Sequence, residues 1–212
     1  MQVAPGSDPG LTGGCMDKDT VARQFNFILE ADRLKTIGRR TLLSDGTRLE
    51  NAAEHSWHAT LTALVFFDQA FVKGMDLERI LKMLLVHDLV EIDAGDTFCY
   101  STEQRRTQVE RERKAADRLF GVLPEAQAEI LRQLWQEFDA MQTPEARFAN
   151  AVDRLQPLLQ AIHTHGRTWR QHGIRKEQVV QRMQPIRTAL PQLWGYVLEM
   201  IDKAAESGYL IK

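Results

Sequence analysis

The sequence has few cysteines, no long apolar run and no excess of charge of one sign. Its 212 residues include only Cys15 and Cys99, too few for a disulfide framework and consistent with a reducing cytoplasm. The longest strongly apolar run, residues 63–67, is far shorter than the ~20 residues of a membrane-spanning helix. The first residues lack the basic and apolar segments of a secretory signal. We therefore expect a soluble cytoplasmic protein without a membrane partner.

The charge balance also argues against one class of partner. The net charge is −2 and the sequence pI is about 6.3, whereas a nucleic-acid polymer favours a strongly basic protein or face. Segment 103–120 carries both Arg and Glu at helical spacing, which is typical of a solvated helix face. We expect no nucleic-acid polymer as partner, while a small anionic ligand needs only a local basic pocket.

Alternating β-branched residues are absent as well, and a helical period dominates. Apolar residues recur at three- and four-residue steps from Val21 to Leu29, which predicts a first helix. The same pattern predicts helices over about 51–73, 76–91, 103–120, 124–141, 144–166, 176–184 and 187–206. We predict an all-α, single-domain bundle over residues 18–212, and a disordered tail over the Gly- and Pro-rich residues 1–17.

Two stretches between the predicted helices look irregular. Residues 38–51 form a connection too long for a tight helical hairpin, and residues 93–101 follow the helix at 76–91. Long loops often carry binding or catalytic groups. We expect both stretches to be loops close to a functional site.

The most informative feature is the pair His87-Asp88 within an apolar helical segment, where neither side chain helps packing. Alone, His87 would more often be a satisfied core histidine. Other side chains that can bind a metal accompany it, however: His55 and Asp153 lie in two other predicted helices, and Glu91 lies one helical turn after His87. Two imidazoles and two carboxylates suit a divalent cation and leave coordination positions for water. This combination points to a hydrolytic metal site.

Four phrases that contain these residues resemble one known family. They are LKTIGRR at 34–40, ENAAEHS at 50–56, HDLVEIDAGD at 87–96 and TPEARFANAVDRLQPLLQ at 143–160. Their order and content are similar to the HD-domain metal-dependent phosphohydrolases, and more narrowly to the small HD proteins of the 5'-deoxynucleotidase type. The resemblance extends from about residue 20 to 200.

This resemblance implies an HD-type helical bundle, commonly a homodimer, that releases phosphate from nucleoside 5'-monophosphates. It implies one divalent metal ion, which could be Mn, Co, Fe, Ni, Zn or Mg. The residues that match the family's metal ligands are His55, His87, Asp88 and Asp153. By the same carry-over, Glu91 would orient or activate the attacking water and Asp96 would assist, for example by protonating the leaving 5'-oxygen. Arg39 would hold the phosphate through its planar donor fork.

One residue departs from the family pattern. Members with a preference for deoxyribonucleotides tend to carry Trp after the phosphate-binding Arg, but this chain has Arg40. Without the bulky Trp side chain against the sugar, there is less reason to expect that the site rejects a ribose 2'-hydroxyl. A second guanidinium also favours a more anionic ligand. Arg40 is therefore a further predicted substrate-binding residue.

Two alternatives stay open at this point. One is a guanosine-tetraphosphate-type pyrophosphohydrolase, for which Arg40 would supply additional positive charge. The other is a non-catalytic helical protein that binds a metal or a nucleotide, against which the additional carboxylates of Glu91 and Asp96 count.

Overall fold

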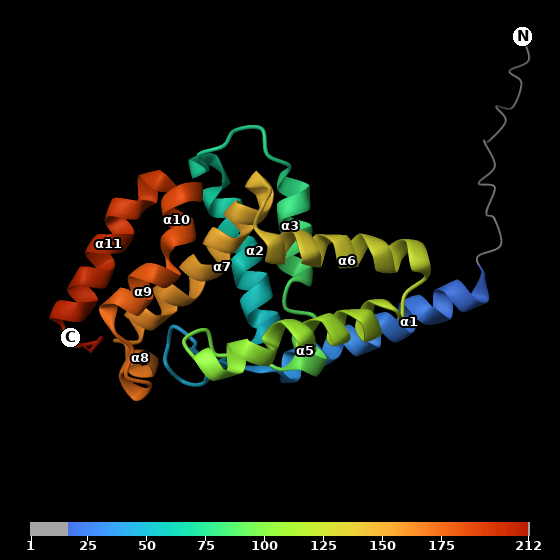
Figure 1. The fold of residues 1–212 in the computed structure, drawn as a ribbon, viewed down its shortest axis with the longest axis horizontal. Helices are drawn as coiled ribbons and strands as arrows, with labels where there is room; N and C mark the ends of the chain where they lie inside the picture. Colours follow the sequence, from blue (N-terminus) through green and yellow to red (C-terminus); the bar gives the residue numbers. More distant parts are fainter. Residues whose placement is uncertain (1–16, 212) are drawn as a thin grey trace, which may run out of the picture.

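Three helices cross at the centre of the molecule. The computed structural model describes residues 17–211, with the backbone alone at 102–105. Helices α2 (Ala52–Phe66), α3 (Leu77–Val86) and α7 (Pro144–His163) pack against one another (Figure 1). Buried apolar side chains such as Ala59, Met83 and Val152 form the main core between them. The predicted all-α, single-domain architecture is confirmed.

The two helices that carry His55 and Asp153 begin at residues suited to a helix start. At α2, the Asn51 side chain accepts from the backbone N–H of Glu54 at 2.9 Å, and the Glu54 carboxylate accepts from the N–H of Asn51 at 3.0 Å. At α7, the Thr143 hydroxyl accepts from the N–H of Ala146 at 3.2 Å, and Pro144 takes a first-turn position where its missing N–H costs nothing.

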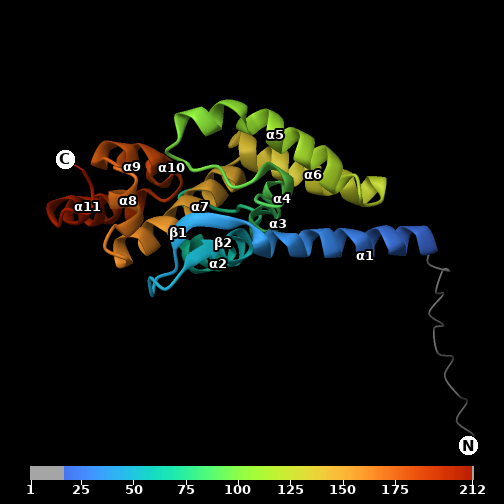
Figure 2. The same ribbon diagram turned by 90° about the horizontal axis from the view of Figure 1, so that it is seen from below.

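A second layer is formed by the N-terminal helix and two helices from the middle of the chain. Helix α1 (Lys18–Asp32) continues into the short 3₁₀ helix η1 (Arg33–Thr36) and packs on α5 (Thr102–Phe120), which packs on α6 (Glu125–Ala140) (Figure 2). Arg23 donates hydrogen bonds to the main-chain carbonyls of residues 121–123, just beyond α5. Phe27 and Phe120 belong to a second apolar cluster beneath this layer.

Four shorter helices follow α7: α8 (Arg167–Gln171), α9 (Lys176–Arg182), α10 (Gln184–Ala189) and α11 (Pro191–Glu206). Helices α8, α10 and α11 pack on α7, and α9 packs on α10 and α11. The prediction of one helix over 187–206 is wrong at Leu190, because Pro191 lacks an N–H and starts a new helix. Helix α8 was not predicted. The chain beyond α11 returns to pair at Ile211 with Arg175.

The stretch 38–51, predicted to be a loop, is instead a β-hairpin. Strands β1 (Gly38–Leu42) and β2 (Leu49–Asn51) are antiparallel, with Gly38 opposite Asn51 and Leu42 opposite Leu49. The turn uses Gly46 at φ +69°. Strand β1 packs on α7 and α8. The hairpin carries no alternating apolar pattern, because its side chains serve the site described below rather than a sheet core.

The helix predicted to carry His87 ends before that residue. Helix α3 stops at Val86, and residues 87–90 form a turn before the short helix α4 (Glu91–Ala94). The N–H of Leu89 donates to Val86 and that of Glu91 to Asp88, three residues back instead of four. Gly95 at φ +74° ends α4. The predicted helix 51–73 is likewise shorter, because α2 ends at Phe66 and is followed by η2 (Phe67–Gln69).

The predicted tail lies almost entirely outside the described residues, and only Asp17 belongs to them. Its carboxylate accepts from the N–H of Thr20 at 3.1 Å and caps α1. Within residues 17–211, none of the helices combines the length and the hydrophobicity that crossing a bilayer requires.

Candidate functional site

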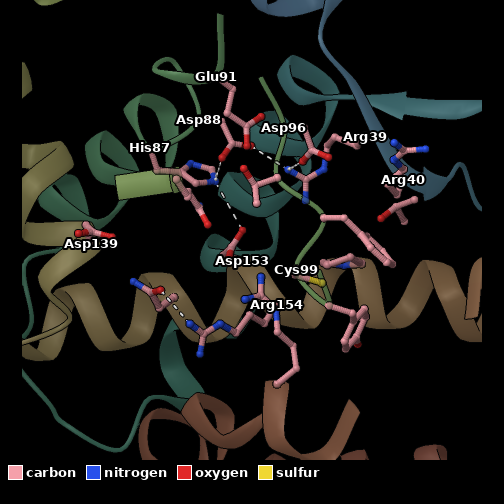
Figure 3. A pocket seen from close by; sticks show the side chains of 18 of the residues that line it. Arg39, Arg40, His87, Asp88, Glu91, Asp96, Cys99, Asp139, Asp153 and Arg154 are labelled. Atoms are coloured by element: carbon pink, nitrogen blue, oxygen red, sulfur yellow. Dashed lines mark hydrogen bonds and ion pairs between the residues drawn. The ribbon is translucent and has the colours of Figure 1, made fainter. Parts of the chain in front are cut away.

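All but one of the predicted site residues line one cavity of about 370 Å³, and the remaining one, His55, lies buried against Asp153. Its lining comes from β1, the turn after α3, α4, the segment that follows α4, and helices α5 to α9. Figure 3 shows His87, Asp88, Glu91 and Asp153 facing the same space, with Arg39 and Asp96 beside them. Helix α7 forms the floor and supplies Asp153. The fold thus brings together side chains from Arg39 to Met183.

Three buried side chains are positioned to hold a metal ion. One ligand atom from each of His55, His87 and Asp153 lies within 4.8 Å of the other two. Asp153 Oδ1 is 2.8 Å from His55 Nε2 and 3.5 Å from His87 Nε2. Imidazole nitrogen and carboxylate oxygen are a common donor set for divalent transition metals. The chemistry of the group fits the divalent metal expected from the sequence.

His87 presents one nitrogen, Nε2, to the cavity side of the metal group. Its Nδ1 donates to the main-chain carbonyl of Leu84 at 2.9 Å, which leaves Nε2 with a lone pair. That Nε2 is buried and makes no hydrogen bond within the described part of the chain, although Asp88 Oδ1 is 3.1 Å away. Burial by itself would lower the pKa of His87, but the carboxylates of Asp88 and Asp153 raise it above its ordinary value. This environment favours positive charge, which a cation between the nitrogen and the carboxylates would supply.

His55 is fully buried and held from behind by an amide. Gln156 Nε2 donates to the carboxylate of Glu50 at 2.8 Å, so Gln156 Oε1 must face His55 Nδ1, also at 2.8 Å. An amide oxygen only accepts, so Nδ1 carries the proton and Nε2 points its lone pair at Asp153. Two acceptors 2.8 Å apart require a proton or a cation between them. Burial would raise the pKa of Asp153, but its contacts with the two histidines hold it well below its ordinary value.

Asp88, the fourth predicted ligand, stands between the metal group and Arg39. Its Oδ1 lies 3.1 Å from His87 Nε2, and its Oδ2 lies 3.9 Å from His55 Nε2 and 3.0 Å from Arg39 Nη1. The structure therefore gathers all four residues predicted as ligands, with Asp88 shared between the metal group and the guanidinium.

Arg39 is an almost buried guanidinium whose nearest ion partners are carboxylates. Besides Asp88, Nη1 lies 3.9 Å from Asp96 Oδ1, and Nε lies 3.5 Å from Glu50 Oε2. Burial would lower the pKa of Arg39, but Asp88, Glu91 and Asp96 raise it, so the side chain stays cationic. By contrast, the following residue of β1, Arg40, is exposed, lines the cavity and lies at one side of it in Figure 3.

The two predicted catalytic carboxyls differ in their surroundings. Glu91 opens α4 and is 8% exposed, and its Oε2 is buried without a hydrogen bond among the described residues. Burial, together with the negative charge of Asp88, raises the pKa of Glu91 well above its ordinary value, against the opposing effect of Arg39. Asp96 is less deeply buried; burial raises its pKa while Arg39 opposes the rise. Both carboxyls line the cavity beside the metal group.

Sequence reasoning missed a buried network behind the metal group. Glu50 is 1% exposed, and its Oε1 accepts from Gln156 Nε2 and Gln160 Nε2, each at 2.8 Å. A signal existed, since Gln156 and Gln160 are polar residues one turn apart, among buried apolar positions on α7. They lie three and seven residues after Asp153, on the same helix face. The cavity walls formed by Cys99, Tyr100, Trp135, Phe138, Arg154 and Arg182 were missed as well.

Known sequences match a large part of the chain. The profile of the HD domain family matches residues 31–194. The chain is 30% identical over 112 residues to the 5'-deoxynucleotidase HDDC2 of Bos taurus, and the alignment covers 53% of each protein. It is 29% identical over 133 residues to the 5'-deoxynucleotidase hdd1 of Schizosaccharomyces pombe, covering 60% of this chain and 65% of that one. The chain thus spans about half the length of the first of these relatives, and under two thirds of the second.

Solved structures match more completely. A predicted metal-dependent phosphohydrolase from Magnetospirillum magnetotacticum is 44% identical, with a TM-score of 0.88 over 93% of this chain and 99% of that one. An HD-domain phosphohydrolase from Listeria innocua is 17% identical, with a TM-score of 0.58 over 88% of this chain and 95% of that one. The second likeness concerns the fold alone.

Proposed function

The chain belongs to the HD domain family, and on that premise we propose that it is a metal-dependent phosphohydrolase that releases phosphate from nucleoside 5'-monophosphates. One observation carries the proposal. The group His55, His87 and Asp153, which is positioned to hold a metal, lies next to the cationic Arg39 and to Glu91, whose buried Oε2 has no hydrogen bond among the described residues. Hydrolysis of a phosphate ester is assisted by these groups together: a metal cation, an oriented guanidinium and a group that accepts a proton from water.

His55, His87, Asp88 and Asp153 would hold one divalent ion. Mn, Co, Fe, Ni, Zn and Mg all remain candidates, because mixed nitrogen and oxygen ligands admit several metals. When bound, such an ion offsets negative charge on the phosphoryl oxygens and makes water a stronger acid. Glu91 lies outside the group that holds the ion and so is available for a different task.

Three side chains are assigned to phosphate binding and proton transfer. Arg39 binds equatorial phosphoryl oxygens, on which charge accumulates as the bond to the leaving oxygen breaks. Glu91 accepts the proton from the attacking water as its oxygen bonds to phosphorus, and burial with the charge of Asp88 raises its pKa, which makes it a stronger base than an exposed carboxylate. Asp96, when protonated, gives its proton to the departing 5'-oxygen. Proton and bond changes then balance, and the products are a nucleoside and orthophosphate.

The substrate class is proposed from the relatives that are named 5'-deoxynucleotidases. Arg40 stands where a Trp is expected for deoxyribose preference, and its exposed side chain lines the cavity, so the proposal includes ribonucleotides as well. The same guanidinium favours one alternative, a guanosine-tetraphosphate-type pyrophosphohydrolase. Pyrophosphate instead of orthophosphate as the released product would identify that activity. A cytoplasmic location remains a prediction from the sequence.

The decisive experiment measures phosphate release from ribo- and deoxyribonucleoside 5'-monophosphates. The protein is stripped with a chelator, and Mn, Co, Ni, Mg or Zn is added back singly. Metal-dependent release of orthophosphate supports the nucleotidase, and the ratio of ribo to deoxy rates reports on Arg40. If no metal restores release while nucleotides still raise the melting temperature, the proposal is wrong and the non-catalytic binding alternative replaces it.

We also propose that the protein is a homodimer. Helix α2 exposes Trp57, Leu61, Leu64 and Val65 by 64%, 41%, 50% and 65%, at spacings that place them on one side of the helix. The helix has no acidic, Lys or Arg residue after Glu54, so a two-fold axis can set this apolar face against itself. Light scattering should give twice the chain mass, and Leu61→Glu with Leu64→Glu should give a folded monomer. A wild-type monomer at micromolar concentration would contradict the dimer.

A further inference from the structure

Glu50 is a buried carboxylate for which the proposed chemistry has no role so far. It lies in β2 between Leu49, which is 50% exposed, and the α2 cap Asn51. Side chains alternate along a strand, so Glu50 points inward when Leu49 points out. With 1% exposure, its charge is costly unless partners compensate it.

The two oxygens of Glu50 are used differently. Oε1 accepts from the amides of Gln156 and Gln160, each at 2.8 Å. Oε2 makes no hydrogen bond among the described residues, yet it faces Arg39 Nε at 3.5 Å and His55 Nδ1 at 3.7 Å. Arg39 Nε is buried and also lacks a hydrogen bond there. A donor and an acceptor, both buried and both unsatisfied, therefore stand slightly too far apart to bond.

The guanidinium of Arg39 is held by another carboxylate through its terminal nitrogen, away from Glu50. Arg39 Nη1 bonds Asp88 Oδ2 at 3.0 Å, and Asp88 is one of the four residues proposed to hold the metal. If Asp88 serves as a metal ligand and a phosphate binds the terminal nitrogens, Arg39 would lose that partner. Glu50 Oε2 is then the nearest acceptor for Nε.

We propose that Glu50 is the positioning residue for Arg39: it holds the guanidinium through Nε, so that the terminal nitrogens face phosphate and Asp88 is free for the metal. This inference rests on the proposed function, since it requires phosphate at Arg39. The carboxylate also anchors Gln156, whose oxygen fixes the proton of His55. One buried charge thus supports the phosphate side and the metal side together.

The substitution Glu50→Gln tests this role with little change in shape. A Gln at this position can still accept from both α7 amides, but its own NH₂ then faces the N–H of Arg39, donor against donor. A hydrogen bond to a charged group is worth about 10- to 100-fold in an equilibrium constant, so we expect inorganic phosphate to bind the Mn²⁺-loaded variant about 10- to 100-fold more weakly by calorimetry. Mn²⁺ affinity should change by less than about tenfold, because Gln156 keeps its acceptor. Glu50→Asp, which retains the charge, should recover part of the phosphate affinity.

A double-mutant cycle separates positioning from mere stability. Lys at position 39 has no Nε–H fork, so Glu50→Gln should cost less than about twofold in phosphate affinity when combined with Arg39→Lys. Thr62→Val is the matched control: Thr62 is buried on α2 and its hydroxyl donates to the main-chain carbonyl of His58 at 2.7 Å. It should lower the melting temperature and leave phosphate affinity unchanged.

Several results would overturn the inference. The first is a Glu50→Gln variant that binds phosphate as tightly as the wild-type protein does. The second is a loss of phosphate affinity on Glu50→Gln that is equal in the wild-type and the Arg39→Lys backgrounds. The third is a wild-type protein that does not bind phosphate. These titrations need no nucleotide. If the wild-type protein binds phosphate but hydrolyses no nucleoside monophosphate, the proposed function fails, while the calorimetry still decides the role of Glu50.

Discussion

Replacement of Glu91 by Gln should separate turnover from metal binding. The change is nearly isosteric, at a side chain that is 8% exposed, and it removes the only group assigned to accept the proton of the attacking water. A positioned general base contributes about 10²- to 10⁴-fold to a rate, which corresponds to about 3–5.5 kcal/mol of activation free energy. We expect kcat to fall by that factor.

Two other quantities should stay nearly constant in Glu91→Gln. The metal-binding group consists of His55, His87 and Asp153 with Asp88 beside it, so Mn²⁺ affinity should change by less than about tenfold. Burial and the charge of Asp88 already disfavour the ionised Glu91, so a neutral amide should leave the melting temperature unchanged or raise it. Turnover in metal-reconstituted protein, calorimetric Mn²⁺ titration and thermal unfolding measure the three effects.

The matched control is Glu112→Gln, the same chemical change elsewhere on the cavity wall. Burial also raises the pKa of Glu112, but its carboxylate is hydrogen-bonded to Gln108 at 2.7 Å. We expect less than a tenfold loss of kcat there. Full activity in Glu91→Gln, or an equal loss in both variants, would refute the assignment of Glu91 as the base.

Three further predictions concern other parts of the site and its support. Gln156→Leu should weaken Mn²⁺ binding by about 10- to 100-fold, because His55 loses the acceptor that orients it, and unchanged affinity by calorimetry would contradict this. Arg40→Trp should raise the ratio of kcat/KM for deoxy- over ribonucleoside monophosphates by about tenfold or more, and a constant ratio would remove Arg40 from sugar selection. Asn51→Ala should cost about 1 kcal/mol in urea unfolding at neutral pH. The Glu54 carboxylate, the other half of this cap, has a pKa of about 2, lowered from 4.5 by Arg48 and the N–H of Asn51. Its contribution to the free energy of unfolding should be complete above about pH 4.5 and lost as the pH falls towards 2. A free energy of unfolding that stays constant over this range would contradict the prediction.

The sequence alone was sufficient to identify most of the helices and to predict the side chains that lie together where a metal could be held. Helical periodicity depends on residues three and four apart, so it is legible without tertiary structure, and α5, α6 and α7 begin and end close to their predicted limits. The side chains of His87 and Asp88 attracted attention because they are polar within an apolar run. Four phrases in a fixed order then placed Arg39 and Asp96 beside them, and the structure brings these residues into one cavity.

Local rules failed where distant parts of the chain decide the conformation. The hairpin at 38–51 has no strand pattern, because its Arg39 and Glu50 face polar partners: Asp88 in the turn after α3, the amides of α7 and the imidazole of His55 on α2. The helix expected to continue through His87 gives way to a turn, which sets Asp88 between the metal group and Arg39.

The tertiary structure alone decided how the site is supported. Glu50 and Gln160 are 110 positions apart in sequence, and His55 and Gln156 are 101 apart, so no local period links them. Their pairing follows from burial: once α2, β2 and α7 pack together, each polar group excluded from water must find a partner among the others. The sequence determined which side chains could bind a metal and a phosphate, and packing determined which nitrogen of each histidine is offered and which carboxylate is left to hold Arg39.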